Sequence, residues 1–197
     1  MFTINPCAAG CGKPAVSGSV LCAAHLADPA AEGNRITNLI LQKKTTRDLS
    51  AQGLHFEDID FSGRQFYGCG FNGAFFRNCN FGSCHMRQVF FDFAYFTNCV
   101  FMNADFRNTS FAGARIAECR FEGSELIDIN FCGTEISDTV FNDNDLYNSR
   151  FIAGSIIKTN FINCNLKAVN FYKYLQTDVI YKSSNTAEAI YEMEDQG

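Results

Sequence analysis

Residues 54–113 read, in blocks of five, LHFED IDFSG RQFYG CGFNG AFFRN CNFGS CHMRQ VFFDF AYFTN CVFMN ADFRN TSFAG. Residues 114–173 continue as ARIAE CRFEG SELID INFCG TEISD TVFND NDLYN SRFIA GSIIK TNFIN CNLKA VNFYK. The third residue of every block, which we call position i, is Phe, Leu, Ile or Met without a break in register. An unbroken internal repeat has to be interpreted before any other pattern in the chain.

A period of five matches neither the 3.6-residue period of a helix nor the two-residue period of a strand. Position i−2 is usually small or β-branched, as at Ala74, Cys79 and Val89. Two inward side chains separated by one outward residue indicate a short extended segment. The last two positions of each block are rich in Gly, Asn and Asp, which are typical of turns. Each block therefore predicts one short side followed by a corner.

The number of sides in one coil follows from the aliphatic residues at position i. Ile and Leu alternate there in the second half of the repeat: Ile116, Leu126, Ile136, Leu146, Ile156 and Leu166. That alternation has a period of twenty, so four blocks form one coil and the range 54–173 forms about six coils. At a strand spacing of ~4.8 Å, six coils make a rod roughly 29 Å long. We therefore predict an all-β solenoid with four interior columns of stacked side chains.

The repeat resembles the pentapeptide-repeat proteins, whose motif is a small residue, Asp or Asn, Leu or Phe, and two variable positions. The resemblance covers about three-fifths of the chain and implies a right-handed quadrilateral parallel β-helix. It implies little about activity, because one fold can serve many functions and activity must be argued from sites.

The segment 1–30 contains the spacing Cys7-x3-Cys11-x10-Cys22-x2-His25. Two closely spaced ligand pairs of this kind can surround one tetrahedral Zn²⁺. A unit this small has little core of its own, so a metal would supply its folding energy. Four protein ligands would make the zinc site structural. The alternative is three reduced cysteines and a surface histidine.

The segments that flank the repeat are expected to cover its open ends. In 31–53 we predict a helix capped by Asn34, with Ile36, Leu39 and Ile40 facing the first coil. The alternative is a linker helix that swings free. The segment 174–197 is predicted to be a cap or a homodimerisation tail, with a short helix that follows Ser184 and runs through Ile190 and Met193.

The cysteines indicate the compartment. Six of the ten occupy position i−2, where reduced thiols act as small apolar side chains: Cys69, Cys79, Cys84, Cys99, Cys119 and Cys164. Cys132, at i+1, is expected near the surface. We find no signal peptide and no membrane-spanning run, so we expect a reduced, cytoplasmic protein that does not contact a membrane.

Outward positions are where a function would lie. Phe75, Phe90, Phe93 and Tyr95 are predicted to point outward at one corner of the second and third coils, and we call these four residues the aromatic corner. Exposed aromatic patches often mark partner sites. The alternative is that long corner side chains fold flat onto the rod.

A second outward feature is the column Asp105, Glu125 and Asp145, one coil apart on the third side. Some members of the resembled family protect DNA gyrase from quinolones by mimicking DNA, so gyrase or a topoisomerase is an alternative partner. The range 54–173 has thirteen acidic and ten basic residues, a net charge of only 10 − 13 = −3. That balance does not favour direct nucleic-acid binding. The alternative to a binding role for the acidic column is a solvated surface with local ion pairs.

No catalytic set is recognisable. The three histidines are His25, in the predicted zinc site, and His55 and His85 at outward positions. Arg64 and Asn144 are large polar residues at position i−2, and we expect each to reach the end of the core or to pair with neighbouring backbone. The sequence therefore predicts a non-enzymatic scaffold that presents a surface to a protein partner.

Overall fold

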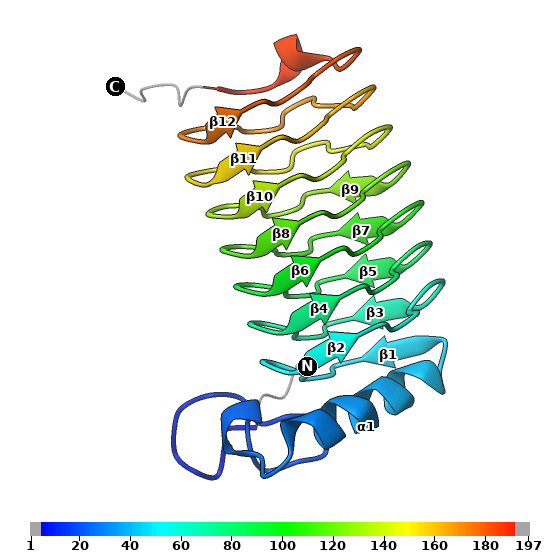
Figure 1. Ribbon diagram of the computed structural model, residues 1–197, viewed down its shortest axis with the longest axis vertical. Helices are drawn as coiled ribbons and strands as arrows, with labels where there is room; N and C mark the ends of the chain where they lie inside the picture. Colours follow the sequence, from blue (N-terminus) through cyan, green and yellow to red (C-terminus); the bar gives the residue numbers. More distant parts are fainter. Residues whose placement is uncertain (1–4, 192–197) are drawn as a thin grey trace.

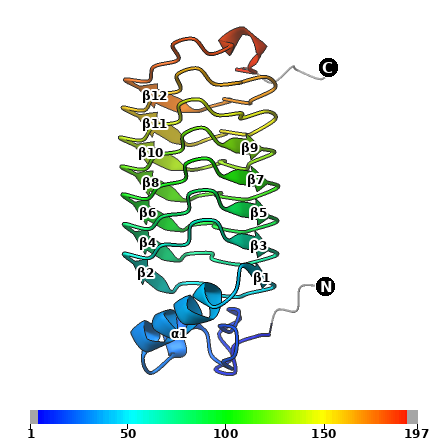
Figure 2. The same ribbon diagram turned by 90° about the vertical axis from the view of Figure 1, so that its right-hand side faces the viewer.

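The computed structural model describes residues 5–191. The chain forms a parallel β-helix of about seven turns that stacks along one axis (Figures 1 and 2). A single α-helix and a compact unit with one 3₁₀ turn lie at its N-terminal end. No helix in the range 5–191 is long and apolar enough to cross a membrane.

Short strands form two of the four sides. The first side holds β2 (His55–Glu57), β4 (Phe75–Arg77), β6 (Tyr95–Thr97), β8 (Arg115–Ala117), β10 (Glu135–Ser137), β11 (Ser155–Ile157) and β12 (Leu175–Thr177). The third side holds β1 (Thr45–Arg47), β3 (Gln65–Tyr67), β5 (His85–Arg87), β7 (Asp105–Arg107) and β9 (Glu125–Ile127). Neighbouring strands are parallel with partners twenty residues apart, as in Phe56↔Phe76. The predicted coil of twenty residues is confirmed.

Position i fills the interior. Every Phe at this position in the range 54–173 is almost fully buried, and rings in one column stack face to face along the axis. The ring centroid of Phe121 lies 4.3 Å from that of Phe101 and 4.6 Å from that of Phe141. Rings of neighbouring columns meet edge to face, the arrangement that aromatic quadrupoles favour.

Position i−2 completes the core. All six cysteines predicted as apolar fillers are buried, and burial raises the pKa of the Cys84 thiol to about 12. Such thiols are inert as nucleophiles. The two polar residues pair with neighbouring backbone as predicted: Asn144 accepts from the Ser124 amide at 2.8 Å, and Arg64 donates to the Lys43 carbonyl at 2.8 Å. Cys132 is half-exposed.

Helix α1 (Pro29–Leu41) lies across the open mouth of the first coil (Figure 2). Ile36 and Ile40 are fully buried and belong to the same core as the β-helix, so the predicted cap is confirmed. The predicted start at Asn34 is wrong. The Asp28 side chain accepts from the Ala31 amide at 2.9 Å, and Pro29 occupies the first helical position. An acidic N-cap followed by proline is a strong start because proline has no N–H to leave unpaired.

The coils extend on both sides of the predicted range 54–173. β1 pairs with β3, which places the buried Thr46 in the column of Phe66. β12 pairs with β11, and Tyr181 then stacks on Phe161 at 5.3 Å. The sequence pattern did not include the first added coil because Thr46 is neither aromatic nor aliphatic. Its backbone still forms strand hydrogen bonds, which do not depend on the side chain. The outcome is about seven turns where about six were predicted.

The C-terminal end is a further coil with an apolar surface. Its one helical element is the single 3₁₀ turn η2 (Thr186–Glu188), so the predicted helix does not form over the described residues, and Met193 lies outside them. The exposed apolar side chains of this end are Leu175, Ile180, Ile190 and Tyr191.

Candidate metal centre and partner surface

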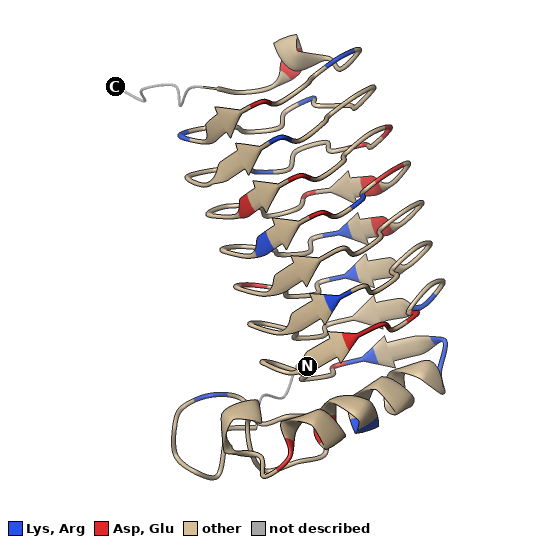
Figure 3. Cartoon of the chain, viewed as in Figure 1, with Lys and Arg blue, Asp and Glu red and all other residues tan. Residues whose placement is uncertain are grey.

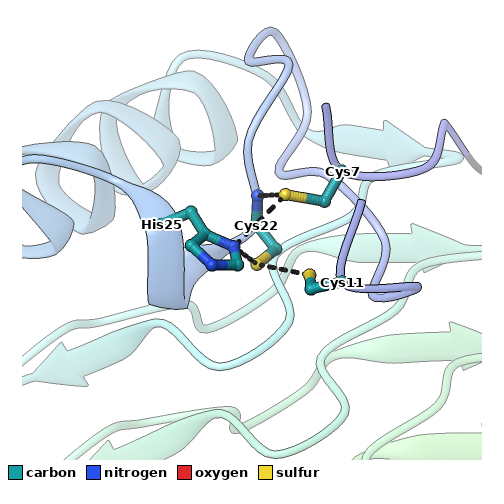
Figure 4. Close-up of side chains that lie close together, drawn as sticks. All are labelled: Cys7, Cys11, Cys22 and His25. Carbon is teal, nitrogen blue, oxygen red and sulfur yellow. Dashed lines mark hydrogen bonds between the residues drawn. The ribbon is translucent and has the colours of Figure 1, made fainter. Parts of the chain in front are cut away.

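Cys7, Cys11, Cys22 and His25 come together at the N-terminal end (Figure 4). Cys22 precedes the 3₁₀ turn η1 (Ala23–His25), and this turn carries the imidazole back toward the sulfur atoms. One potential ligand atom from each residue lies within 4.8 Å of all the others. The predicted Cys3His cluster is present in the structure.

The spacing of the ligand atoms suits a tetrahedral zinc ion. The Nδ1 atom of His25 lies 3.5 Å from Cys7 Sγ and 3.4 Å from Cys22 Sγ, and Cys11 Sγ lies 3.6 Å from Cys22 Sγ. Zn–S bonds of about 2.3 Å and Zn–N bonds of about 2.0–2.1 Å at tetrahedral angles place sulfur atoms about 3.8 Å apart and sulfur about 3.6 Å from nitrogen. These three distances agree with those values, and every other pair of ligand atoms lies within 4.8 Å.

Backbone groups prepare the cluster for a cation. Gly10 and Gly12 adopt positive φ angles of 72° and 75°, which let the chain turn tightly around Cys11. The Cys22 amide donates to Cys7 Sγ at 3.3 Å, and this hydrogen bond lowers the pKa of the Cys7 thiol to about 6. A low pKa favours the thiolate, which is the form that binds a metal.

The unit that carries the cluster is joined to the β-helix. Val16 is buried in the common core, and the Ser17 amide donates to the Ser50 carbonyl at 2.8 Å. In return, the Ser50 amide donates to Ser17 Oγ at 2.8 Å. Arg35 of α1 contacts the Ser17 carbonyl and pairs with Glu32. The cluster therefore sits on a segment that helps to close the first coil.

The aromatic corner is only partly assembled as predicted. Phe75 and Tyr95 stack with centroids 4.5 Å apart and planes within 3°. His55 stacks below Phe75 at 4.3 Å, and the Arg115 guanidinium lies 5.6 Å from the centroid of Tyr95. His55 and Arg115 were missed, although their spacing of twenty residues from the predicted pair was a usable signal.

Phe93 is the unusual residue of the corner. It holds φ at 58°, is 68% exposed, and is the only aromatic residue with positive φ in the described chain. One coil away in the same column, Gly113 leaves the space that the ring covers, since a Cβ there would lie 2.6 Å from the ring. Phe90 lies on the fourth side between Gly70 and Ser110 and, in the described part of the chain, stacks on none of the other three.

The acidic column on the third side is largely neutralised. Asp105 pairs with Arg87 at 2.5 Å and with Arg107 at 3.3 Å, and Arg107 also reaches Glu125 at 2.5 Å. Burial would raise the pKa of Asp105, but the hydrogen bond and charge of Arg87 outweigh it and the pKa is lowered. Asp145 accepts from Asn165 at 2.8 Å. Basic and acidic segments accordingly lie next to each other on β7 (Figure 3).

Residues 74–151 match the family profile described as a pentapeptide repeat region. This segment is a pentapeptide repeat region. The pentapeptide repeat family is generally non-catalytic, in agreement with the filled interior of the rod.

Two solved structures are similar to this chain. A trypsin-treated form of QnrB1, a plasmid-mediated fluoroquinolone resistance protein, is 18% identical, with 71% of this chain and 68% of that chain covered and a TM-score of 0.54. HetL, a pentapeptide repeat protein involved in heterocyst differentiation regulation in the cyanobacterium Nostoc sp. strain PCC 7120, is 13% identical, with 81% and 96% covered and a TM-score of 0.30. The likeness to QnrB1 shows a shared fold. No curated protein sequence matches the chain.

Proposed function

We propose that this protein is a non-enzymatic scaffold that binds a protein partner through the aromatic corner and carries a structural zinc ion at its N-terminal end. The observation that carries the proposal is Phe93, an exposed phenyl ring held in a left-handed backbone conformation.

Phe93 is unfavourable for folding. The left-handed conformation recurs at position i+2 throughout the rod, mostly at Gly, Asn and Asp, and Gly73 and Gly113 occupy the neighbouring positions in the column of Phe93. A phenylalanine there costs roughly 1–2 kcal/mol relative to glycine. Its exposed ring recovers little of that cost through burial. Large aromatic side chains dominate binding hot spots, and Phe93 is the one aromatic residue that the described chain places in this conformation.

The Phe75–Tyr95 stack provides a rigid neighbouring surface. Both rings are more than one-third exposed, at 38% and 37%, and their positions are set by strands β4 and β6. A partner that contacts preordered rings loses less side-chain entropy than one that must order them. The rings thus supply exposed apolar area at low entropic cost.

The Cys3His cluster supports a zinc ion with four protein ligands. A site without an open position has no place for a reacting water or substrate, so the role that we propose is structural. It would hold the segment that contains Val16 and Ser17 against the first coil.

The corner is tested by replacing Phe75, Phe90, Phe93 and Tyr95 together by Ser. We expect this variant to lose the proteins that the natural chain captures from cells of its source, since hot-spot residues each contribute ~2 kcal/mol or more. The measurement is quantitative mass spectrometry of the captured proteins. A Tyr147→Ser control removes an exposed aromatic ring from the third side and should retain them. Capture of the same proteins by the corner variant would remove the corner from the proposal.

DNA gyrase is the second candidate partner, because QnrB1, a fluoroquinolone resistance protein, shares the fold. The ion pairs of Asp105 and Glu125 with arginine argue against a surface that imitates the unpaired charges of DNA. We therefore expect the purified protein to leave gyrase supercoiling and its inhibition by a fluoroquinolone unchanged. Restoration of supercoiling in the presence of the drug would favour gyrase instead.

We also propose that a second copy covers the C-terminal end, where Leu175 is 75% exposed. Sedimentation velocity should then give a dimer for the natural chain and a monomer for Leu175→Asp, and a monomer for both would refute the contact.

A reducing, cytoplasmic compartment accords with the buried thiols of the core, and fractionation of source cells would test it.

A further inference from the structure

A groove of ≈ 540 Å³ separates the metal-binding unit from the β-helix. One wall belongs to the unit and includes Lys13, Pro14 and Ala24. The opposite wall belongs to the first three coils and includes His55, Asp92 and Phe93. The groove therefore exists only while the unit is held in place against the β-helix.

The floor and walls of the groove are mainly apolar, but each wall carries a charge. Lys13 is exposed on the unit, and Asp92 lies on the β-helix, where it accepts a hydrogen bond from Ser110. Neither forms an ion pair with any residue in the range 5–191. An occupant that places an apolar group between the walls would meet a cation on one side and a carboxylate on the other.

The groove also continues into the aromatic corner. His55 lines both the groove and a smaller hollow of ≈ 230 Å³ that contains Phe75 and Tyr95. Phe93, the one aromatic residue with positive φ in the described chain, forms part of the groove wall. A compact ligand would occupy the groove alone, whereas an extended chain can follow both hollows.

We propose that the groove binds an extended segment of the protein partner, with an apolar side chain between the walls and an acidic residue next to it that faces Lys13. The charge of Asp92 sets the direction of the segment, because a carboxylate facing that wall would be repelled. Because the Cys3His unit forms one wall, the segment binds only when the cluster holds its metal. This inference rests on the proposed function and adds to it the chemistry of the partner and its dependence on the metal.

The test uses a phage-displayed library of random twelve-residue peptides, selected on the full-length, zinc-loaded protein. We expect the enriched peptides to share an aromatic or large aliphatic residue beside Asp or Glu. Fluorescence anisotropy with one labelled peptide then measures affinity. Ala24→Arg, which fills the groove from an exposed position, should weaken binding at least about tenfold, and Lys13→Glu about threefold. Val20→Arg adds the same charge to the unit at a residue that does not line the groove, and should leave the affinity within about twofold.

Removal of zinc with a chelator should abolish peptide binding while the circular dichroism of the β-helix persists. The groove proposal is overturned if chelated protein binds as well as loaded protein, if Ala24→Arg binds normally, or if no peptide is enriched. If peptide affinity is lost when Phe75 and Tyr95 are replaced but is unchanged in Ala24→Arg, the groove proposal is overturned and the aromatic corner remains as the binding site. Failure of the proposed function itself is seen separately, in the capture experiment with the corner variant.

Discussion

Replacing Cys22 by Ser is expected to reduce bound zinc from about one ion per chain to none and to release the N-terminal unit from the first coil. Cys22 is buried and lies within 3.6 Å of Cys11 Sγ and within 3.4 Å of His25 Nδ1, so it joins the two exposed ligands to the interior of the unit. Structural zinc contributes about 10–16 kcal/mol in zinc-finger peptides, far more than the few apolar contacts of this unit can replace.

Metal analysis of protein purified without added metal gives the zinc content, and amide hydrogen exchange reports the release. Exchange should rise at the amides of Val16 and Ser17, which bond to the Leu21 and Ser50 carbonyls, and stay slow in the middle coils. The matched control is Cys132→Ser, which changes a half-exposed thiol outside the cluster and should keep one zinc. Natural protein without zinc, or a Cys22→Ser variant that keeps it, would contradict a structural metal centre.

The second large effect is expected in the aromatic core. Phe121→Ala should destabilise the protein by about 3–5 kcal/mol, because it removes a fully buried ring from the middle of a stack and leaves a cavity that rigid coils cannot close. Phe101 and Phe141 would lose their stacking partner on one side. The loss falls in a central coil, where each turn depends on both neighbours.

Chemical denaturation followed by circular dichroism measures this loss as a lower midpoint. Phe90→Ala serves as the control, because it removes the same side chain from an exposed position on the fourth side and should cost less than ~1 kcal/mol. Equal losses for the two variants would contradict the prediction that the buried columns contribute more to stability than the exposed surface does.

The sequence predicted the core well because the same physical requirement recurs at every fifth residue. Alternation of Ile116 and Leu126 and of Ile136 and Leu146 was sufficient to give the twenty-residue coil, which strand pairing then confirmed. The cluster of Cys7, Cys11, Cys22 and His25 was also predictable, because ligand pairs close in sequence cannot be far apart in space.

Features that do not follow from the repeat, such as the choice between two possible N-cap residues, were harder to predict. Asn34 is a plausible N-cap in isolation, but Asp28 followed by Pro29 begins the helix earlier and leaves Asn34 inside it. The first coil was missed because Thr46 breaks the apolar pattern while its backbone still pairs. The pairing of Asp105 with Arg87 needed the direction of each side chain, and the groove needed the position of the metal unit, neither of which the repeat contains.

We propose that the aromatic corner serves binding at a cost to folding, and the Phe93→Gly variant separates these two effects. Glycine adopts a φ of 58° without strain, so the free energy of unfolding of this variant is predicted to be unchanged or higher by up to roughly 1–2 kcal/mol. Chemical denaturation should accordingly give the same or a higher midpoint. In the same preparations, capture of the partner by the variant is predicted to fall at least about tenfold relative to the natural chain. A variant that is less stable, or that captures the partner as well as the natural chain does, would show that Phe93 does not serve binding at a cost to folding.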